Sequence, residues 1–384
     1  MRALIVPFLA MALAACGGGS GGDAASTDGG SPAVANPVCD RTSWVAGSTE
    51  FCRGMLIYRD YVYDDYGADA GLASLDPAVS NIINRGGVLG SPVAITPGLL
   101  SPTAGDKRYP VGLENTADLV RLTMAIEGNE LVVDFELNTM FNPGDALAAI
   151  AIDTDNNPAT GGGAWTPLNT ASQGWDVLKV FAEGDPETNH IVGRLPLPSG
   201  SVWRVQAAVA QKDGTVMNVA FRGVDEQAGA DGLAQQFLPG AGNFWEDRQA
   251  AALARGDISA FGEVVRVADL RSGVTRAASS PKGFHQRVYT SKYTLGEGVS
   301  ISGMPGYHGD TKMVCEQYFH YLGKYQPYGI YIPTGTGGGT PGLQLVMHGC
   351  QANHASQINQ PNMQQQFGEG LNRILVAPLG RGPV

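Results

Sequence analysis

Two runs of alternating apolar and polar residues, joined by a short turn, constrain the fold of this chain most strongly. Apolar residues occupy every second position over residues 120–126 and again over residues 131–137, and Gly128 and Asn129 lie between the runs. A strand points successive side chains to opposite faces, so each run predicts a strand with one buried and one wet face. The Gly-Asn turn between them predicts a β-hairpin.

Further short apolar runs follow this hairpin at regular spacing. They occupy residues 146–152, 177–181, 203–209, 216–222 and 264–267. Short strands separated by turn residues are typical of a β-sandwich, which we expect over residues 39–275. Residues 244–254 are rich in Ala, Glu and Arg and predict a helix that stops at Gly256. The fold class is therefore predicted to be mainly β.

Charge and size exclude some classes of function. The 384 residues carry 25 basic and 36 acidic side chains, a net charge of −11. Affinity for nucleic acid comes mainly from Lys and Arg on phosphates, so we expect no nucleic-acid partner. The length exceeds that of one small domain and fits two.

Two acidic clusters are candidate calcium sites. Calcium takes six to eight oxygen ligands on a tight turn. The first cluster follows an apolar strand and the second lies in a tyrosine-rich stretch; the candidate ligands are Asp153, Asp155 and Asn157, and Asp64, Asp65 and Asp69. The first is not an EF-hand, because Pro158 stands where that loop needs glycine and Ala164 replaces the bidentate glutamate. The alternative is that these aspartates only cap turns.

These clusters within a β-rich block resemble the glucodextranase C-terminal-type domain. That domain is similar to family 9 carbohydrate-binding modules, and the resemblance covers most of residues 55–275. It implies a calcium-stabilised sandwich that binds sugar. Trp165 lies in a glycine-rich loop and is the candidate for stacking on a sugar, whereas Trp203 shares the face of Val205 and Val209 and is expected in the core.

The first residues predict export. Arg2 precedes an apolar run that is too short for a transmembrane helix, and small residues then lead to Cys16. This ending resembles a lipobox, which implies a signal peptide over residues 1–15 and acyl chains on Cys16 that anchor the protein to a lipid membrane of the bacterial cell envelope. Residues 16–38 form a Gly- and Ser-rich tether. The alternative is an ordinary secretory signal cut near Ala15, with an extracellular product.

The remaining four cysteines are expected in disulfides. Cys39 and Cys52 are close in sequence and predict a local disulfide in an oxidising compartment. Cys315 and Cys350 would then pair by elimination, although the sequence alone allows three connectivities.

The last hundred residues predict a different fold. Residues 343–350 form an apolar run that predicts a buried strand ending in His348-Gly349, residues 362–372 predict a helix, and residues 374–378 predict a second buried strand. The run Leu-Val-Met-His-Gly-Cys-Gln resembles secreted polyhydroxybutyrate depolymerases and feruloyl or acetylxylan esterases. The resemblance implies that residues 276–384 begin an α/β-hydrolase sheet, with the backbone of Gly349, Cys350 and Gln351 holding the oxyanion of an ester. His348 is expected to be structural.

A serine esterase also needs a nucleophile, an acid and a histidine in that order. Ser356 is the only serine after Gly303 and lacks the flanking glycines of a nucleophile elbow. The expectation is a truncated hydrolase sheet, inactive as it stands, whose full-length form attacks polyester or polysaccharide esters. The alternatives are a carbohydrate-binding surface lipoprotein without catalysis and a structural envelope protein.

Overall fold

The computed structural model describes residues 39, 41–62, 113, 116–225, 248–292, 324–335, 339–347, 354 and 358–378. Within these residues strands greatly outnumber helices, which confirms the mainly β fold class. Among the described helices none is both long and apolar enough to cross a membrane.

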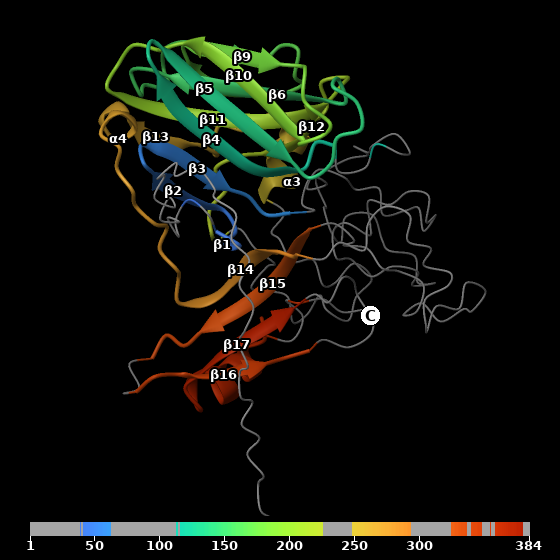
Figure 1. Ribbon diagram of the computed structural model, residues 1–384, viewed down its shortest axis with the longest axis vertical. Helices are drawn as coiled ribbons and strands as arrows, with labels where there is room; N and C mark the ends of the chain where they lie inside the picture. Colours follow the sequence, from blue (N-terminus) through green and yellow to red (C-terminus); the bar gives the residue numbers. More distant parts are fainter. Residues whose placement is uncertain are drawn as a thin grey trace, which may run out of the picture. The chain divides into compact units, whose positions relative to one another are not determined.

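Two five-stranded sheets form the sandwich (Figure 1). The first has the order β10-β5-β4-β3-β2, with β2 (Ser48–Cys52), β3 (Met55–Arg59), β4 (Leu119–Glu127), β5 (Glu130–Leu137) and β10 (His190–Pro196). The second has the order β12-β11-β6-β9, with β13 also paired to β11; its strands are β6 (Ala146–Asp153), β9 (Val177–Phe181), β11 (Val202–Gln211), β12 (Val216–Val219) and β13 (Glu263–Arg266). The predicted hairpin is confirmed as β4 and β5, which pair around Gly128.

The sandwich core lies between these sheets. Leu122 and Phe135 of the first sheet belong to the same buried cluster as Ile150, Trp203 and Val205 of the second. Trp203 is fully buried, which confirms its predicted place in the core. Burial of apolar surface on this scale is the main favourable term in folding, at roughly 25 cal/mol for each Å² removed from water.

A second buried cluster covers the outer face of the second sheet. Ala149 and Ala208 point to that face and pack with Trp165 and with Leu253 of helix α3 (Arg248–Arg255). Burial on both faces explains why residues 146–152 are continuously apolar instead of alternating. The predicted helix is confirmed over the described part of its range.

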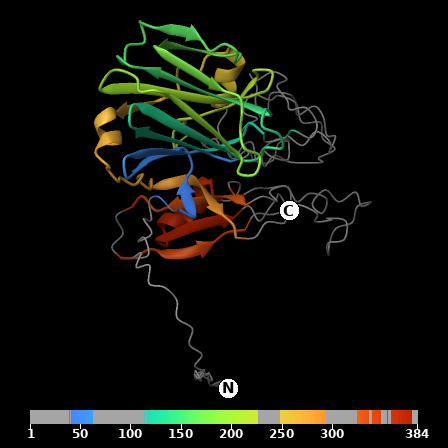
Figure 2. The same ribbon diagram turned by 45° about the horizontal axis from the view of Figure 1, so that its top comes forward.

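The third sheet has the order β1-β14-β15-β17-β16 and is drawn in orange and red apart from blue β1 (Figure 2). Its strands are β1 (Ser43–Val45), β14 (Gly283–Thr290), β15 (Tyr325–Ile332), β16 (Gly342–Leu345) and β17 (Arg373–Pro378). Strand β1 therefore pairs with β14 although it comes directly before the sandwich strands in sequence. The remaining elements are the two-stranded sheet β7 (Gly162–Ala164) and β8 (Ala171–Trp175), helix α4 (Val267–Arg271), helix α5 (Pro361–Met363) and the π-helical turn η3 (Gln364–Glu369).

Strands β16 and β17 are parallel neighbours joined through α5 and η3. Parallel strands require a crossover of this kind, which makes the segment a βαβ unit. One face of the unit is packed, since Tyr331, Val346 and Leu375 form a buried cluster against Met363 and Phe367. The helical prediction for residues 362–372 is confirmed over residues 362–369.

The predicted strand at residues 343–350 is confirmed over residues 343–345, but its predicted burial holds only for Val346, which is 8% exposed. Leu343 and Leu345 are 75% and 64% exposed, and Met347 is 60% exposed. Strand β16 is the last strand in the order of its sheet, so it has a hydrogen-bonded neighbour on one side only. An apolar run favours a nonpolar environment, but its side chains are buried only where a second layer of residues packs on the strand.

Candidate metal centre

The candidate metal centre lies where β6 ends and β9 begins. These strands are antiparallel neighbours, and Ile152 of β6 is paired with Val177 of β9. Asp153 follows Ile152, and Asp176 precedes Val177, so the register brings both aspartates to the same end of the strand pair. The backbone N–H of Asp176 donates to the carbonyl oxygen of Ile152 at 2.9 Å and extends the pairing by one step.

Three carboxylates meet at this position. Asp153, Asp155 and Asp176 each offer one oxygen, and these oxygens all lie within 4.8 Å of one another. Asp155 and Asp176 are exposed, whereas Asp153 is only 2% exposed. The group could bind a metal ion, because carboxylate oxygens are the ligands that hard cations take.

The two oxygens of the Asp153 carboxylate differ in their surroundings. Oδ1 accepts hydrogen bonds from the backbone N–H groups of Asp155 and Asn157, both at 3.2 Å. Oδ2 is buried and has no hydrogen-bond partner among the described residues. Burial raises the pKa of the Asp153 carboxyl group above its ordinary value. A buried carboxylate oxygen without a donor is costly, and a bound cation would remove that cost.

The loop after β6 holds the other ligands in place. Asp155 Oδ1 accepts the N–H of Asn157 at 3.0 Å, and the Thr160 hydroxyl donates to Asp155 Oδ2 at 3.1 Å. The Asp176 carboxylate accepts both the N–H and the hydroxyl of Thr154, at 2.8 and 2.7 Å. The sandwich therefore ties the Asp155 loop and the Asp176 turn together without help from a ligand.

Gly174 permits the close approach of this loop to the turn before β9. Its φ of +88° lies in the left-handed region, and an added Cβ would lie 2.6 Å from the Cα of Pro158 and 3.2 Å from Asp153 Oδ2. A side chain at position 174 would push the loop away from the carboxylates. Glycine at this position thus contributes directly to the geometry of the cluster.

The sequence identified part of this cluster. Asp153 and Asp155 come together as predicted, and Asp176 is the member that sequence reasoning missed. Asn157 is beside them, but its Oδ1 accepts the N–H of Ala159 at 3.2 Å, as a turn cap does. Only the β6–β9 register brings Asp176 close, and no local spacing indicates it. Asp64, Asp65 and Asp69 lie outside the described residues.

The predicted sugar-stacking role of Trp165 is wrong on its geometry. Trp165 is 0% exposed and belongs to the buried cluster that includes Leu253 of helix α3. Its Nε1 donates to the Ser172 hydroxyl at 2.8 Å. A ring that stacks on a sugar needs an open face, and this ring has none. The glycine-rich sequence around it indicated a loop but did not reveal that the loop folds over the sheet.

The disulfide between Cys39 and Cys52 is confirmed, with a Cα–Cα distance of 5.4 Å. The other cysteine predictions concern Cys16, Cys315 and Cys350, which lie outside the described residues. The predicted oxyanion backbone at Gly349, Cys350 and Gln351 also lies outside them.

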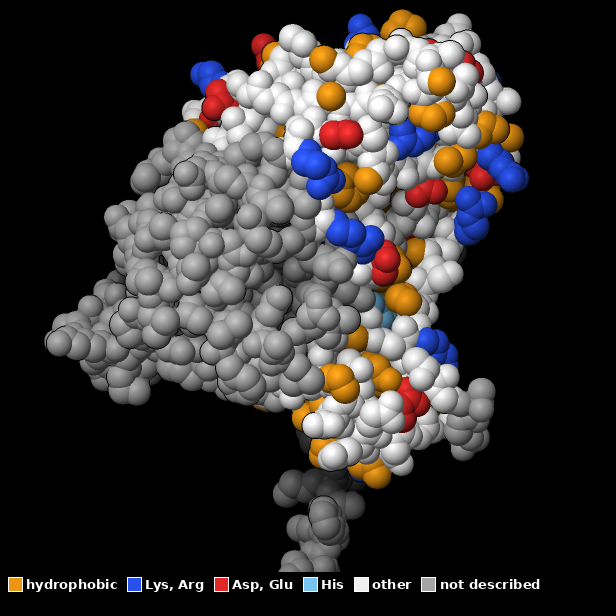
Figure 3. Space-filling view, turned by 180° about the vertical axis from the view of Figure 1, so that it is seen from behind, with side chains coloured by type: hydrophobic (Ala, Val, Ile, Leu, Met, Phe, Trp, Pro, Cys, Tyr) orange, Lys and Arg blue, Asp and Glu red, His pale blue; other side chains and the backbone are white. Residues whose placement is uncertain are grey.

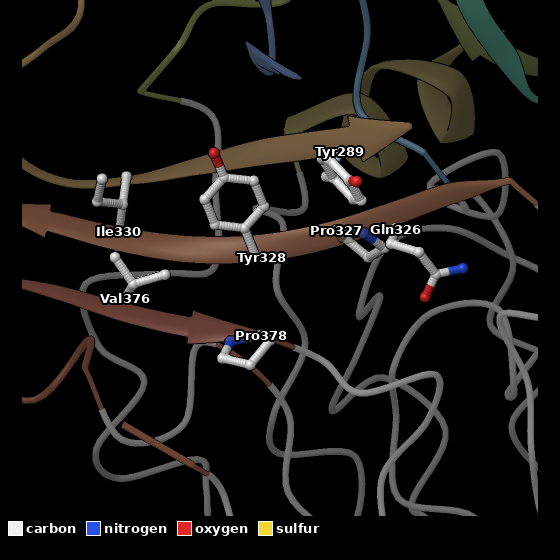
Figure 4. A pocket seen from close by; sticks show the side chains of 7 residues that line it. All are labelled: Tyr289, Gln326, Pro327, Tyr328, Ile330, Val376 and Pro378. Carbon is white, nitrogen blue, oxygen red and sulfur yellow. The ribbon is translucent and has the colours of Figure 1, made fainter. Parts of the chain in front are cut away.

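An apolar cavity of about 400 Å³ lies on the third sheet (Figure 4). Tyr289 comes from β14, Tyr328 and Ile330 from β15, and Val376 and Pro378 from β17. The Tyr328 hydroxyl is held by the Ser43 hydroxyl and by Arg287 Nε, both at 2.8 Å. A volume of this size is typical of cavities that take small molecules.

No protein-family model matches the chain, and no curated protein matches it. A solved structure with some similarity is an endonuclease/exonuclease/phosphatase from Beutenbergia cavernae DSM 12333. The two chains are 14% identical over a match that covers 26% of this chain and 22% of that chain, with a TM-score of 0.17. A likeness this slight carries no argument about fold or function.

Proposed function

We propose that this chain is the exported, membrane-anchored part of a serine ester hydrolase that acts on polyester or polysaccharide esters. In this proposal the sandwich is a calcium-stabilised accessory domain, and the third sheet begins the hydrolase. The observation that carries the proposal is the parallel pair β16 and β17. In the sequence, β16 comes shortly before His348 and Gly349, which carry the esterase resemblance.

The carboxyl ends of β16 and β17 share one edge of the third sheet because the two strands are parallel. In open α/β sheets, ligands bind beyond the carboxyl ends of the strands. The backbone of Gly349, Cys350 and Gln351 comes shortly after β16 in the sequence. Its N–H groups are the donors we assign to the oxyanion that forms when a serine attacks an ester carbonyl.

The apolar cavity supports an ester with an alkyl or aromatic part. It reaches Pro378 at the carboxyl end of β17, and Tyr328, which is paired with Pro378, contributes its ring. Figure 4 shows these side chains on adjoining strands. An ester bound at the sheet edge could place its apolar portion here and gain from burial.

Calcium is the metal we assign to Asp153, Asp155 and Asp176. Calcium takes an all-oxygen ligand set with flexible geometry and accepts carboxylates beside carbonyls and water. The three aspartates supply oxygens alone, and the described group contains no histidine or cysteine. The ion would neutralise the buried Asp153 carboxylate and hold the loop after β6 against the turn before β9.

Export to an oxidising compartment is supported by the Cys39–Cys52 disulfide, since such bonds persist mainly outside the cytoplasm. Cys16 would carry the acyl chains that anchor the protein to the lipid membrane of the cell envelope. The tether would then place the sandwich and the hydrolase sheet away from the membrane, where a polymeric substrate can reach them.

The decisive experiment compares residues 1–384 with the product of the whole coding sequence that contains them. We expect residues 1–384 to be inactive toward p-nitrophenyl butyrate. The whole product is expected to hydrolyse this ester, and a fluorophosphonate should label a serine downstream of Val384 within a Gly-x-Ser-x-Gly sequence.

Variants of the active product then test the oxyanion assignment. Gly349→Val keeps the backbone N–H groups but should displace them from the oxyanion, and we expect kcat to fall by about 100-fold or more, as when one oxyanion donor is lost. Gly342→Ala in β16 is the control, because an added Cβ there meets only an ordinary contact with the Arg373 side chain at 3.6 Å. The proposal fails if the coding sequence stops at Val384, or if Gly349→Val leaves kcat unchanged.

A further inference from the structure

Three arginines converge on a cavity of about 130 Å³ where the first sandwich sheet meets the third sheet. Arg59 and Arg121 come from β3 and β4, and Arg41 precedes β1. The rings of Trp44 and Tyr325 meet edge to face nearby, with centroids 5.8 Å apart. We call this the arginine cavity and define it by Arg41, Arg59 and Arg121.

Positive charge exceeds negative charge around the arginine cavity. Glu50 accepts from Arg41 Nε at 2.9 Å and from Arg59 Nε at 2.5 Å. Glu136 pairs with Arg121 Nη2 at 2.9 Å and with Lys324 Nζ at 3.3 Å, and it accepts a hydrogen bond from the Tyr325 hydroxyl. Four cations therefore share two carboxylates. This excess occurs in a chain whose net charge is −11.

The surface elsewhere looks different. Several basic groups lie beside acidic groups on the face drawn in Figure 3. Away from the arginine cavity, Arg194 forms ion pairs with both Glu127 and Glu130. Such exposed pairs are hydrated and contribute little to stability. The arginine cavity instead gathers like charges, and the charges of Arg121 and Arg41 add to burial in lowering the pKa of Arg59.

Two of the arginines keep donor groups for a ligand. A guanidinium group carries five N–H donors. Among the described residues, the bonds of Arg41 use only its Nε, and those of Arg121 use only its Nη2. Both side chains line the cavity and are partly exposed, at 25% and 29%. The Arg59–Glu50 pair, in contrast, is buried and acts as a fixed support.

We propose that the arginine cavity binds a small oxyanion, a carboxylate or a phosphate, between the guanidinium groups of Arg41 and Arg121. The planar fork of arginine matches two oxygens of either group. The volume is that of about four water molecules at ~30 Å³ each, which suits one such anion with few further atoms. A bound anion would balance the excess charge and strengthen the contact between the first and third sheets. The inference does not depend on the proposed hydrolase function.

Isothermal titration of the purified chain with inorganic phosphate and, separately, with acetate tests this site. Ionic strength is held constant with chloride. We expect saturable binding of at least one anion. Arg41→Gln should weaken binding by about 10-fold or more, the loss that corresponds to one charged hydrogen-bonded contact of about 1.4 kcal/mol. Arg194→Gln is the control and should bind as the wild type does.

The substitutions should leave the fold intact, so that a change in anion binding is not caused by unfolding. Arg41→Gln leaves Glu50 paired with the buried Arg59, and Arg41→Lys keeps the charge but removes the fork. Circular dichroism checks that each variant is folded. Phosphate also stabilises folded proteins without binding a site, so the comparison between Arg41→Gln and Arg194→Gln decides. The proposal is overturned if the wild type shows no saturable anion binding, or if Arg41→Gln and Arg194→Gln bind the anion equally well. If Arg41→Lys binds more weakly than the wild type, the planar guanidinium group of Arg41 contributes to binding beyond its charge.

Discussion

Asp153 at the end of β6 and Asp176 just before β9 bring carboxylate oxygens within 4.8 Å of each other, with Asp155 completing the group. One of the Asp153 oxygens is buried, and no group in the described part of the chain donates a hydrogen bond to it. The strand register creates this relationship, since Ile152 and Val177 are cross-strand partners. The register therefore places the three candidate ligands together at one end of the strand pair.

Calcium should raise the thermal stability of the chain through this group. At a concentration about 100 times its Kd, a ligand that binds only the folded state adds about 2.7 kcal/mol to the free energy of unfolding. Asp176→Asn should abolish most of this gain, measured as the rise in Tm on adding calcium. Asp213→Asn removes an exposed turn carboxylate away from the group and should keep it.

Asp153→Asn should have opposite effects on stability in the absence and in the presence of calcium. Without calcium this variant should match or exceed the wild type in stability, because it removes the charge from a buried carboxylate whose pKa is raised. With calcium it should be less stable than the wild type, because it lacks a ligand. A calcium response that survives in both Asp153→Asn and Asp176→Asn would contradict the assignment.

The contribution of Glu369 to the stability of the fold should depend on pH. Its carboxylate accepts hydrogen bonds from the Tyr331 hydroxyl at 2.6 Å and from the N–H groups of Thr334 and Gly335 at 2.7 and 2.9 Å. These bonds lower the pKa of Glu369 from 4.5 to about 2. Because the folded pKa is depressed, the contribution is complete above pH 4.5 and is lost as pH falls toward 2.

Glu369→Gln should therefore lower the free energy of unfolding by about 1 kcal/mol at neutral pH, a modest value because the group is partly exposed. The difference from the wild type should shrink as the pH approaches 2. Denaturant unfolding across this range measures it, with the exposed Glu183→Gln as control. A difference that stays constant with pH would show that the carboxylate charge is not involved.

His190 should titrate above its ordinary range. Its Nδ1 lies 2.7 Å from Asp134 Oδ1 on the neighbouring strand, and this hydrogen bond raises the pKa of His190. A raised folded pKa means that the pair stabilises the fold below pH 6.5 and that this contribution is lost as the pH rises through the folded pKa. NMR titration of the imidazole checks the value. In Asp134→Asn the pKa should fall toward 6.5; an unchanged value would refute the pairing.

Trp165 should matter for stability and not for sugar binding. Its side chain is fully buried in the cluster that includes Ala149 of the second sheet and Leu253 of α3, so Trp165→Ala should cost about 3–5 kcal/mol. In the wild type, acrylamide should quench Trp165 fluorescence poorly, as measured with Trp165→Phe for subtraction. Efficient quenching, or loss of binding to a polysaccharide in a Trp165→Phe variant that remains folded, would restore the original prediction.

Anchoring through Cys16 is tested in cells. Labelled palmitate should be incorporated into the wild type, and Cys16→Ser should abolish both the label and fractionation with membranes. Cys315→Ser is a matched control that leaves the leader intact. Export of a soluble, unlabelled wild-type protein would favour the ordinary secretory signal instead.

Elements with strong local periodicity could be predicted from the sequence. The β4–β5 hairpin follows from alternation around Gly128, and α5 with η3 follows from a polar stretch between two apolar runs. The Cys39–Cys52 disulfide follows from proximity in sequence. Burial was less predictable: β16 is as apolar as a core strand but is largely exposed, because only its other face and one edge have partners.

The sequence by itself determined where strands and turns form and which loop carries Asp153 and Asp155, since these depend on neighbouring residues. Only the tertiary structure decided that Asp176 joins them, that Trp165 is covered, and that arginines from three separate segments surround one cavity. Each of these depends on strand register and sheet packing between residues far apart in the chain. Alternation and turn chemistry specify a strand, but they do not specify which distant strand will lie beside it.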